Sequence, residues 1–411
     1  MNSNPDQATA DELSALAQVF AQAATSIATP AFVYEDAFIR SRCEHLKQIA
    51  DKAGCGLLYS VKALTLPWVL ELIAPYVQGF SVSSLFEAVT ARNVLNVLQA
   101  EATVHLTTPG LRPNEIGKIS EVCDYVSFNS ISQWLRHKND LADKLEVGLR
   151  VNPEVSFLDD PRYDPCRAYS KLGASTHAVN KALGQSSPAS HGLSGLLVHN
   201  NCNSPDSREL LLTVHKLEYE LDYVLENSQW INLGGGYLFD KDSTNQDSFD
   251  EAVGSLKSRH GLEVFIEPGS AFVRDAGFLV STVLDVIESS GKSIAILDTT
   301  VNHVPESFEY EWRPDVLLDL DGGRYPYIIA GSTCLAGDVF GEYAFAEPLE
   351  IGSTVVMYGV GAYNLVKAHT FNGLPLPSVY SLGAGGEVTL MKRFTLEEQS
   401  QRWGFEASAR F

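Results

Sequence analysis

The chain has 411 residues, 45% of them hydrophobic, and its 30 Lys and Arg against 51 Asp and Glu give a formal net charge of −21. That is too long for one ordinary hydrophobic core and too apolar for disorder, so two domains are expected. The negative charge disfavours nucleic acid polymers and membranes as partners, because both are anionic. It is compatible with a cationic or small neutral ligand and with ordinary solubility.

The cysteines are scattered without a CxxC pair, which is typical of reduced thiols in a cytosol. They are Cys43, Cys55, Cys123, Cys166, Cys202 and Cys334. Residues 11–24 have the period of an amphipathic helix without a basic region before it, and no apolar run approaches the roughly 18 residues that span a bilayer. We therefore expect a cytoplasmic protein without a membrane anchor or export signal.

The extended run 31–34 follows Pro30 and is expected to join a sheet formed by the C-terminal part of the chain. From Gly56 to Gly269, short apolar runs alternate with longer segments of helical period, which is typical of βα units around a parallel sheet. The strand candidates are 56–61, 79–83, 103–106, 125–128, 146–151, 193–198, 230–233 and 262–266. Eight such strands close a (β/α)8 barrel.

The gap 152–192 is longer than one helix with two short loops requires, and it predicts a mouth loop containing Asp164, Pro165 and Cys166. After Gly277 the helical period is weak, and strands are predicted at 278–287, 293–297, 327–329 and 354–358. This change indicates a separate antiparallel β domain. We expect the barrel to span 38–275, and the β domain to combine 1–37 with 276–411.

Polar residues at the carboxyl ends of the predicted barrel strands carry the most weight, because barrel enzymes place their active sites there. They are Lys62, Ser83, Arg150, His199, the run Gly234–Gly236 and Glu267. Apolar neighbours would desolvate the Lys62 ammonium and favour an imine with an aldehyde such as pyridoxal phosphate. Taken alone, a lysine that extends to solvent is the commoner arrangement.

The three glycines would let backbone N–H groups approach a phosphate, at the place where barrels commonly bind one; a tight turn is the alternative. Glu267 could keep a pyridine nitrogen protonated, which makes the ring an electron sink. His199 could stack on that ring or be a satisfied strand histidine. Arg150 could lie under the lysine end of the cofactor or pair with a barrel carboxylate.

Three motifs follow in the β domain: GSTCLAGD with Cys334, GVGAYN with Tyr363, and FNG ending at Gly373. A cysteine in a glycine-flanked loop beside an aspartate could donate a proton, whereas a buried small hydrophobe is the ordinary alternative. Tyr363 could bind a phosphate oxygen or cap a strand end. No metal is expected.

Taken in order, these motifs resemble the fold type III pyridoxal-phosphate decarboxylases, whose alanine-racemase-like barrels include ornithine, arginine and diaminopimelate decarboxylases. The resemblance runs from TPAFVYE at Thr29 to FNG at Gly373. The motifs RVNPEVS, YDPC with SKLG, LDTTVNHVPE and CLAGDVFGEY are most similar to the carboxynorspermidine (carboxyspermidine) decarboxylases.

The resemblance implies a role for each motif. Lys62 would form the imine with pyridoxal 5′-phosphate, His199 would stack on the ring, and Glu267 would contact the pyridine nitrogen. Gly234–Gly236 and Tyr363 would contact the phosphate, and Ser83 and Arg150 would complete the cofactor pocket. Cys334 would return a proton to Cα from the partner subunit, so the enzyme would be a homodimer with two composite sites.

The implied reaction removes the α-carboxylate of a 3-amino-3-carboxypropyl group and leaves a 3-aminopropyl group, in polyamine biosynthesis. Substrate contacts are expected from Asn203, Tyr237, Ser270, His303, Glu306, Leu335 and Asp338. Leu335 replaces the acidic residues that in the wider group read a distal amine. Asn203, Tyr237 and Ser270 stand where the resembling subfamily has a glutamate, a histidine and a glutamate. Glu306, Asp338 and Glu342 could instead form interface ion pairs.

Three alternatives remain open at this stage. In the first, the same decarboxylation takes place on a 3-amino-3-carboxypropyl group attached to another molecule, for example a nucleotide-peptide antibiotic of the microcin C type during maturation. The second is an amino-acid racemase, which Glu267 and the cysteine loop disfavour. The third is a non-catalytic homologue, which would need neither Lys62 nor Cys334.

Overall fold

In the computed structural model, residues 20, 26–141, 144–184, 186, 188–240, 243–320 and 322–404 are described. Apart from Phe20, the helix predicted over 11–24 lies outside them. The chain forms two compact units. One is Arg40–Phe272, and the other combines the described residues before Arg40 with those from Val273 onward.

The unit Arg40–Phe272 is a closed barrel of eight parallel strands, and each of the eight predicted strands is confirmed. They are β2 (Gly56–Ser60), β3 (Gly79–Val82), β4 (Thr103–Thr108), β5 (Tyr125–Phe128), β6 (Glu146–Asn152), β8 (Gly195–Val198), β9 (Trp230–Asn232) and β10 (Glu263–Ile266). The pairs β10–β2 and β5–β6 complete the ring. Since the strands are buried on both faces, most of them are short runs rich in apolar residues.

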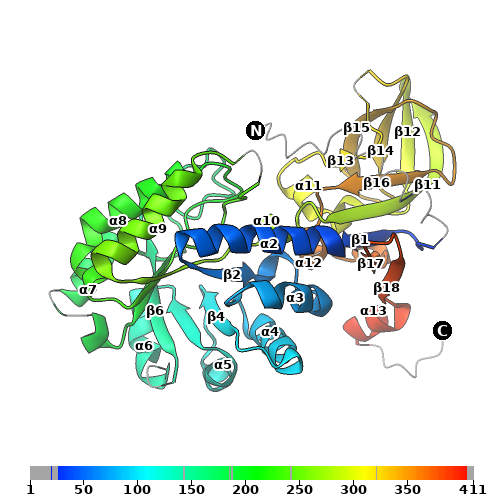
Figure 1. Ribbon diagram of the computed structural model, residues 1–411. Coiled ribbons are helices and arrows are strands. Elements are labelled where there is room, and N and C mark those ends of the chain that lie inside the picture. The colour runs from blue at the N-terminus through cyan, green and yellow to red at the C-terminus, as the bar shows by residue number, and fades with distance from the viewer. Residues whose placement is uncertain are drawn as a thin grey trace. The chain divides into compact units, whose positions relative to one another are not determined.

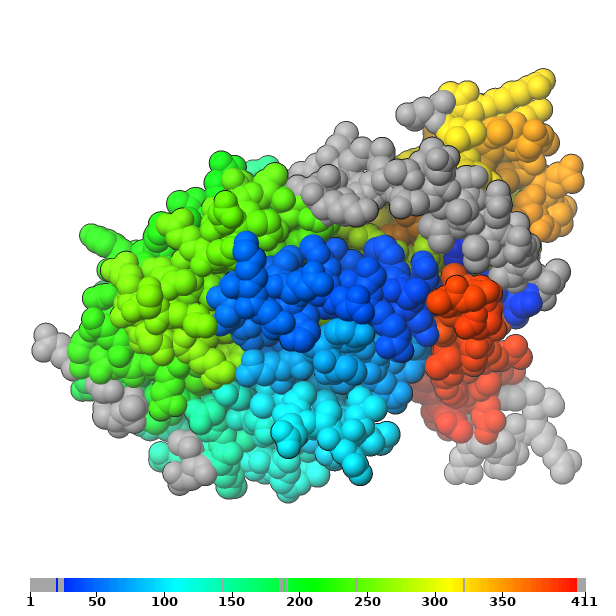
Figure 2. Space-filling view, viewed as in Figure 1, coloured from blue at the N-terminus to red at the C-terminus, as the bar shows by residue number. Residues whose placement is uncertain are grey.

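Helices follow the strands and form the outer layer of the barrel (Figure 1). They are α2 (Asp36–Ala53), α3 (Pro67–Ile73), α4 (Leu85–Leu98), α5 (Ile116–Val122), α6 (Ile131–Leu141), α7 (Thr176–Leu183), α8 (Arg208–Glu226), α9 (Gln246–His260) and α10 (Ser270–Val273). On the face seen in Figure 2, the blue, cyan and green atoms of the barrel segments lie side by side.

One end of the barrel interior is filled by a small aromatic cluster. Trp230 packs with Leu58 and Phe265, and the Tyr125 ring lies edge-on to Trp230 at 5.4 Å. A side chain at Gly195 would place its Cβ 2.1 Å from the indole. Glycine is therefore required beside Trp230, and the barrel is a packed core at this end.

The long connection after β6 forms the predicted mouth loop. Residues 153–173 run without regular structure before the two-residue strand β7 (Ala174–Ser175), and they contain Asp164, Pro165 and Cys166. The loop is held by Asn129, whose Nδ2 donates to the carbonyl of Lys171 at 2.7 Å and whose Oδ1 accepts from the Gly173 N–H at 3.0 Å. The buried side chain of Asn129 thus fixes the end of the mouth loop at Lys171 and Gly173.

The second unit contains a mixed β-sheet. Its strands are β1 (Ala31–Glu35), β11 (Gly277–Ser289), β12 (Lys292–Leu297), β13 (Asp315–Val316), β14 (Tyr325–Ala330), β15 (Val339–Phe345), β16 (Thr354–Tyr358), β17 (Ser378–Leu382) and β18 (Val388–Lys392). The expected return of β1 to this sheet is confirmed. The antiparallel prediction needs correction, because β1–β17 and β12–β14 are parallel pairs.

Four further strands, β13, β15, β17 and β18, escaped prediction, as did three short helices. The helices are α11 (Pro305–Glu309), α12 (Asn364–Lys367) and α13 (Leu396–Arg402). The core of the unit is an apolar cluster that includes Val33, Phe278, Val280 and Tyr380. Among the helices of the described ranges, none combines the length and apolar composition needed to cross a bilayer.

Candidate active site

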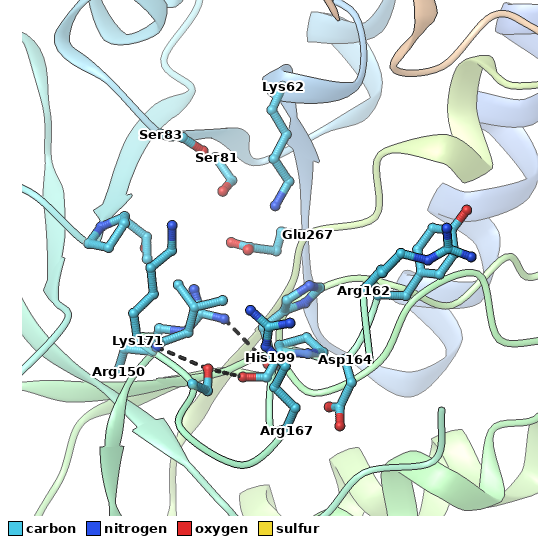
Figure 3. A pocket seen from close by; sticks show the side chains of 16 residues that line it. Lys62, Ser81, Ser83, Arg150, Arg162, Asp164, Arg167, Lys171, His199 and Glu267 are labelled. Atoms are coloured by element: carbon cyan, nitrogen blue, oxygen red, sulfur yellow. Dashed lines mark hydrogen bonds between the residues drawn. The ribbon is translucent and has the colours of Figure 1, made fainter. Parts of the chain in front are cut away.

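A cavity of about 420 Å³ lies at the carboxyl ends of the barrel strands (Figure 3). It brings together five of the predicted cofactor residues, each from a different strand end. These are Lys62 after β2, Ser83 after β3, Arg150 on β6, His199 after β8 and Glu267 after β10. Parallel strands in a closed barrel place such distant positions at one opening.

Lys62 occupies a single 3₁₀ turn, Val61–Ala63, directly after β2. Its neighbours Val61 and Ala63 are fully buried, and they fix the backbone from which the lysine side chain points into the cavity. The primary amine is thereby presented to the cavity from a packed strand end.

Ser83 is held by the start of α4. Its N–H donates to Oε2 of Glu87 at 2.7 Å, and the Glu87 N–H donates to Oγ of Ser84 at 3.2 Å. Burial raises the pKa of the Glu87 carboxyl, while the Ser83 N–H and the Lys62 charge oppose this rise. The paired hydrogen bonds fix the turn on which Ser83 reaches the cavity.

Glu267 is oriented by a residue that the sequence did not single out. Asn232, 1% exposed, donates from Nδ2 to Oε2 of Glu267 at 2.8 Å. Its Oδ1 accepts the N–H of Gly234 at 2.8 Å. The one available signal was a polar side chain inside the apolar strand WIN, two residues before the glycines. Because Nδ2 can only donate and Oδ1 can only accept, one orientation of the Asn232 amide satisfies both partners.

The surroundings of His199 favour the neutral imidazole. Burial, with the nearby positive charges of Lys62 and Arg150, holds its pKa well below the usual value. Its Nδ1 accepts the N–H of Gly235 at 3.1 Å, so the ring proton resides on Nε2. Arg150 donates from Nη2 to the His199 carbonyl at 3.4 Å. Burial lowers the pKa of Arg150, against the influence of Glu267, yet a guanidinium keeps its charge.

The run Gly234–Gly236 passes directly behind these residues. A Cβ at Gly235 would lie 2.4 Å from the Glu267 carbonyl oxygen, and Gly236 has φ +93° with the Asn201 carbonyl 2.2 Å from its missing Cβ. The N–H groups of Gly234 and Gly235 donate within the protein. Any contribution to a phosphate site therefore rests on Gly236 and on the space that the absent side chains leave.

The three neutral substrate candidates of the barrel do not line the cavity. Asn203 is exposed with φ +48°, and Tyr237 is buried at 6% exposure. The bridge between Ser204 and Tyr237 brings these two candidate segments side by side. Burial raises the pKa of the Tyr237 hydroxyl. Ser270 begins α10.

The cysteine loop belongs to the mixed-sheet unit. Cys334 is exposed, and its N–H donates to Oδ1 of Asn372 at 2.8 Å. Asp338 is only 3% exposed, and its carboxylate accepts the N–H groups of Val301 at 2.8 Å and Thr333 at 3.0 Å. Both oxygens are thus engaged by the protein. A carboxylate so occupied is suited to shaping the loop, and the substrate contact expected of Asp338 stays a prediction. Leu335, half-buried, accepts at its carbonyl from the Asp338 N–H at 3.0 Å.

The other candidates of this unit are also engaged. Glu306 Oε1 lies 3.0 Å from Nζ of Lys367, and burial raises the pKa of its carboxyl. His303 is fully buried, with Nδ1 3.0 Å from Oγ1 of Thr299 and a pKa lowered by burial to about 3. Tyr363 has φ +61° directly before α12, and Glu342 on β15 pairs with Lys292.

The remaining lining residues were not predicted as cofactor or substrate contacts, although Asp164 and Pro165 were expected in the mouth loop. They are Ser81, Thr107, Pro109, Arg162, Tyr163, Asp164, Pro165, Arg167, Ser170, Lys171 and Leu172. Most belong to the mouth loop, which its length and the motifs YDPC and SKLG had marked. Within the described ranges, no group of three or more His, Cys, Asp or Glu side chains is arranged to hold a metal ion.

Comparison with known proteins agrees over most of the chain. The family model "Pyridoxal-dependent decarboxylase, C-terminal sheet domain" matches residues 31–361. Carboxyaminopropylagmatine decarboxylase of Synechocystis sp. is 33% identical over 393 residues, covering 92% of this chain and 96% of that protein. Carboxynorspermidine/carboxyspermidine decarboxylase of Campylobacter jejuni is 30% identical over 391 residues, covering 92% and 98%.

Solved structures show the same architecture. The crystal structure of carboxynorspermidine decarboxylase from Campylobacter jejuni, complexed with norspermidine, superposes with a TM-score of 0.82 at 29% identity. The match covers 92% of this chain and all of that one. Diaminopimelate decarboxylase from Helicobacter pylori shares the fold, with a TM-score of 0.81 at 18% identity over 94% of this chain and 99% of that one.

Proposed function

Because the chain belongs to the pyridoxal-dependent decarboxylases, we propose that it removes the α-carboxylate of a 3-amino-3-carboxypropyl group as CO₂ and leaves a 3-aminopropyl group. One observation carries the proposal: Lys62, His199 and Glu267, from three different strand ends, meet in one cavity. An amine, a flat neutral ring and a carboxylate are the groups that pyridoxal chemistry requires of a protein.

The cavity residues suit the cofactor. Lys62 would hold the aldehyde carbon, and Glu267 the pyridine nitrogen. Since Asn232 occupies Oε2 of Glu267, the other carboxylate oxygen is left for the ring nitrogen. When bound, pyridoxal phosphate supplies the electron sink into which the electrons of the broken carbon–carboxylate bond pass.

His199 orients and shields the ring face. A neutral imidazole, fixed through Nδ1 by the Gly235 N–H, stacks on an aromatic ring without placing a positive charge against a protonated pyridine. Arg150 holds the His199 carbonyl and thereby the position of that ring.

Cys334 is proposed to deliver the proton to Cα after the carboxylate leaves, from a thiol that the Asp338-anchored loop presents. We place this thiol in the site of a second copy, so the working enzyme is a homodimer with two composite sites. A cytoplasmic location is also proposed. In support, all six cysteines lie within the described ranges and none is in a disulfide.

Carboxynorspermidine and carboxyspermidine, in polyamine biosynthesis, are the first substrates to test, since relatives at 30% identity bear those names. A second candidate is the same 3-amino-3-carboxypropyl group on a body that carries an anion. It is motivated by Asn203, Tyr237 and Ser270, which carry no carboxylate where the resembling subfamily has a glutamate, a histidine and a glutamate.

Replacing Lys62 with Ala tests the reaction. Without the amine, we expect no visible absorbance band that borohydride removes and no CO₂ release. The measurements are absorption spectra and a CO₂ assay of protein supplied with cofactor, and Lys181→Ala on the outer helix α7 is the matched control. Turnover by Lys62→Ala at the wild-type rate would refute the assignment.

A further inference from the structure

We propose that Arg42, on helix α2, is a positioning residue for the phosphate of the cofactor. Its guanidinium binds the loops that follow β9 and β10 and so holds together the two walls between which the phosphate would lie. The inference rests on the proposed pyridoxal phosphate chemistry. It adds a residue that no motif marked and that is not among the residues lining the cavity.

The two loops are suited to a phosphate by their place in the barrel. β9 and β10 are its seventh and eighth strands, and barrels commonly bind phosphate at the loops after these two strands. The loop after β9 contains the run Gly234–Gly236, and the loop after β10 runs from Glu267 to α10. They lie against each other, since the Glu267 N–H donates to the Gly234 carbonyl at 2.8 Å.

Each loop keeps a backbone donor without a partner. Within the described ranges, no hydrogen bond uses the N–H of Gly236 or the N–H of Gly269. The N–H groups of Gly234 and Gly235, by contrast, are both occupied. Gly269 is buried, and a donor that is shielded from water is rarely left unpaired in a protein. An oxyanion such as a phosphate monoester would accept from both loops.

The guanidinium of Arg42 binds both loops through their carbonyls. Nε donates to the carbonyl of Ala271 at 2.9 Å, at the end of the loop after β10. Nη2 donates to the carbonyls of Leu238 at 2.9 Å and Phe239 at 3.2 Å, in the loop after β9. The residues bearing these carbonyls are buried. Because the N–H groups of a planar guanidinium point in fixed directions, Arg42 sets the spacing of the two loops.

The loop after β9 needs an anchor because its backbone is strained at Phe239. This residue has φ +50°, in the left-handed region that an aromatic side chain disfavours. Its ring packs edge-on against Phe249 of α9 at 5.1 Å, and its carbonyl also accepts from Nε2 of His45 at 2.9 Å. Without Arg42, we expect the strained segment to relax and to displace Gly236, three residues earlier in the chain.

Two forms of the cofactor separate a role at the phosphate from a general role in the fold. The full chain, freed of cofactor, is titrated with pyridoxal 5′-phosphate and with pyridoxal, which lacks the phosphate, and the imine absorbance reports binding. In Arg42→Lys and Arg42→Gln, the dissociation constant of pyridoxal 5′-phosphate should rise about tenfold, since neither side chain has the planar fork. The dissociation constant of pyridoxal should change less than about twofold.

Arg40 on the same helix provides the matched control. Its side chain is exposed, and Arg40→Lys and Arg40→Gln should leave both dissociation constants unchanged. Equal weakening of the two cofactor forms in the Arg42 variants would overturn the inference, and so would unchanged binding of pyridoxal 5′-phosphate. If circular dichroism shows that both Arg42 variants are unfolded, then Arg42 serves the stability of the barrel and the inference is also wrong.

The proposed function fails separately from this inference. A wild-type chain that binds pyridoxal 5′-phosphate through Lys62, but releases no CO₂ from any 3-amino-3-carboxypropyl compound, would refute the proposed decarboxylation. The titrations of the Arg42 variants would stand in that case, because they measure cofactor binding without substrate.

Discussion

At the scale of residues, the site depends on one buried chain of hydrogen bonds. It runs from Glu267 through Asn232 to Gly234, and Gly235 continues it to His199. The positions of Glu267, proposed for the ring nitrogen, and of His199, proposed for the ring face, are therefore linked through the Asn232 side chain. Glu267 and His199 stood out in the sequence as polar residues at strand ends. Asn232 did not, because its importance arises from a partner 35 residues away.

Replacing Asn232 with Asp tests this chain. A second carboxylate at the position of the Asn232 amide, 2.8 Å from Glu267, would repel it until one of the two takes up a proton. We expect cofactor affinity and kcat each to fall about tenfold or more, with the loss relieved as pH is lowered. The pH dependence of the cofactor absorbance and of kcat measures the effect.

The double variant Asn232→Asp with Glu267→Gln provides the control. It restores one amide and one carboxylate and should recover stability, but it moves the negative charge away from the ring nitrogen and should not recover kcat. If the single variant Asn232→Asp has the wild-type pH profile, then Asn232 does not position Glu267.

His105 gives a second residue-scale prediction. Its ring lies inside the barrel, stacked on Tyr125 at 4.0 Å, and burial lowers its pKa from 6.5 to about 3. Above pH 6.5 the ring is neutral in both folded and unfolded chains and has no effect. Below pH 6.5 the unfolded chain takes up a proton that the folded chain refuses until about pH 3, so stability falls as pH falls.

The His105→Gln variant should lack this loss. Between pH 8 and pH 5.5, the free energy of unfolding of the wild type should fall by about 1.4 kcal/mol more than that of His105→Gln. Urea titrations at the two pH values measure the difference, with exposed His177→Gln as the matched control. Equal falls in all three proteins would contradict the buried neutral ring.

At the scale of elements, the barrel strands were predictable because each is an apolar run between helical segments. The sheet strands β15 and β18 were not. Gly341 interrupts β15, and all but the first residue of β18 are exposed, so neither has a local apolar pattern. Their existence depends on pairing with β14 and β17. The mouth loop was predicted from its length, whereas the backbone position of Lys171 and Gly173 depends on Asn129.

The aromatic end of the barrel yields an element-scale prediction. Gly195→Ala puts a Cβ within 2.6 Å of three indole atoms of Trp230 and should destabilise the protein by about 1–3 kcal/mol through overpacking. Gly254 in α9 has no atom within 4 Å of an added Cβ. Gly254→Ala should stabilise by about 0.5–1 kcal/mol through helix propensity. Chemical denaturation measures both, and equal effects would contradict the packed end.

At the scale of the whole molecule, the proposed homodimer predicts complementation between two inactive chains. Lys62→Ala removes the amine of one chain and Cys334→Ala the thiol of the other. If each site combines Lys62 of one copy with Cys334 of the other, random mixing leaves about a quarter of the sites intact. After dissociation and reassociation, the mixture should recover about a quarter of wild-type CO₂ release. No recovery in a mixture shown by mass to contain heterodimers would contradict composite sites.

The central claim is the loss of the α-carboxylate with return of a proton to the same carbon. It is tested most directly by mass spectrometry of the reaction in D₂O, with carboxynorspermidine and with a 3-amino-3-carboxypropyl group on another scaffold as substrates. The account predicts that the accepted compound yields one CO₂ for each 3-aminopropyl product, that the product carries one carbon-bound deuterium, and that Lys62→Ala yields neither. Deuterium exchange at Cα without CO₂ would indicate a racemase and would contradict the account.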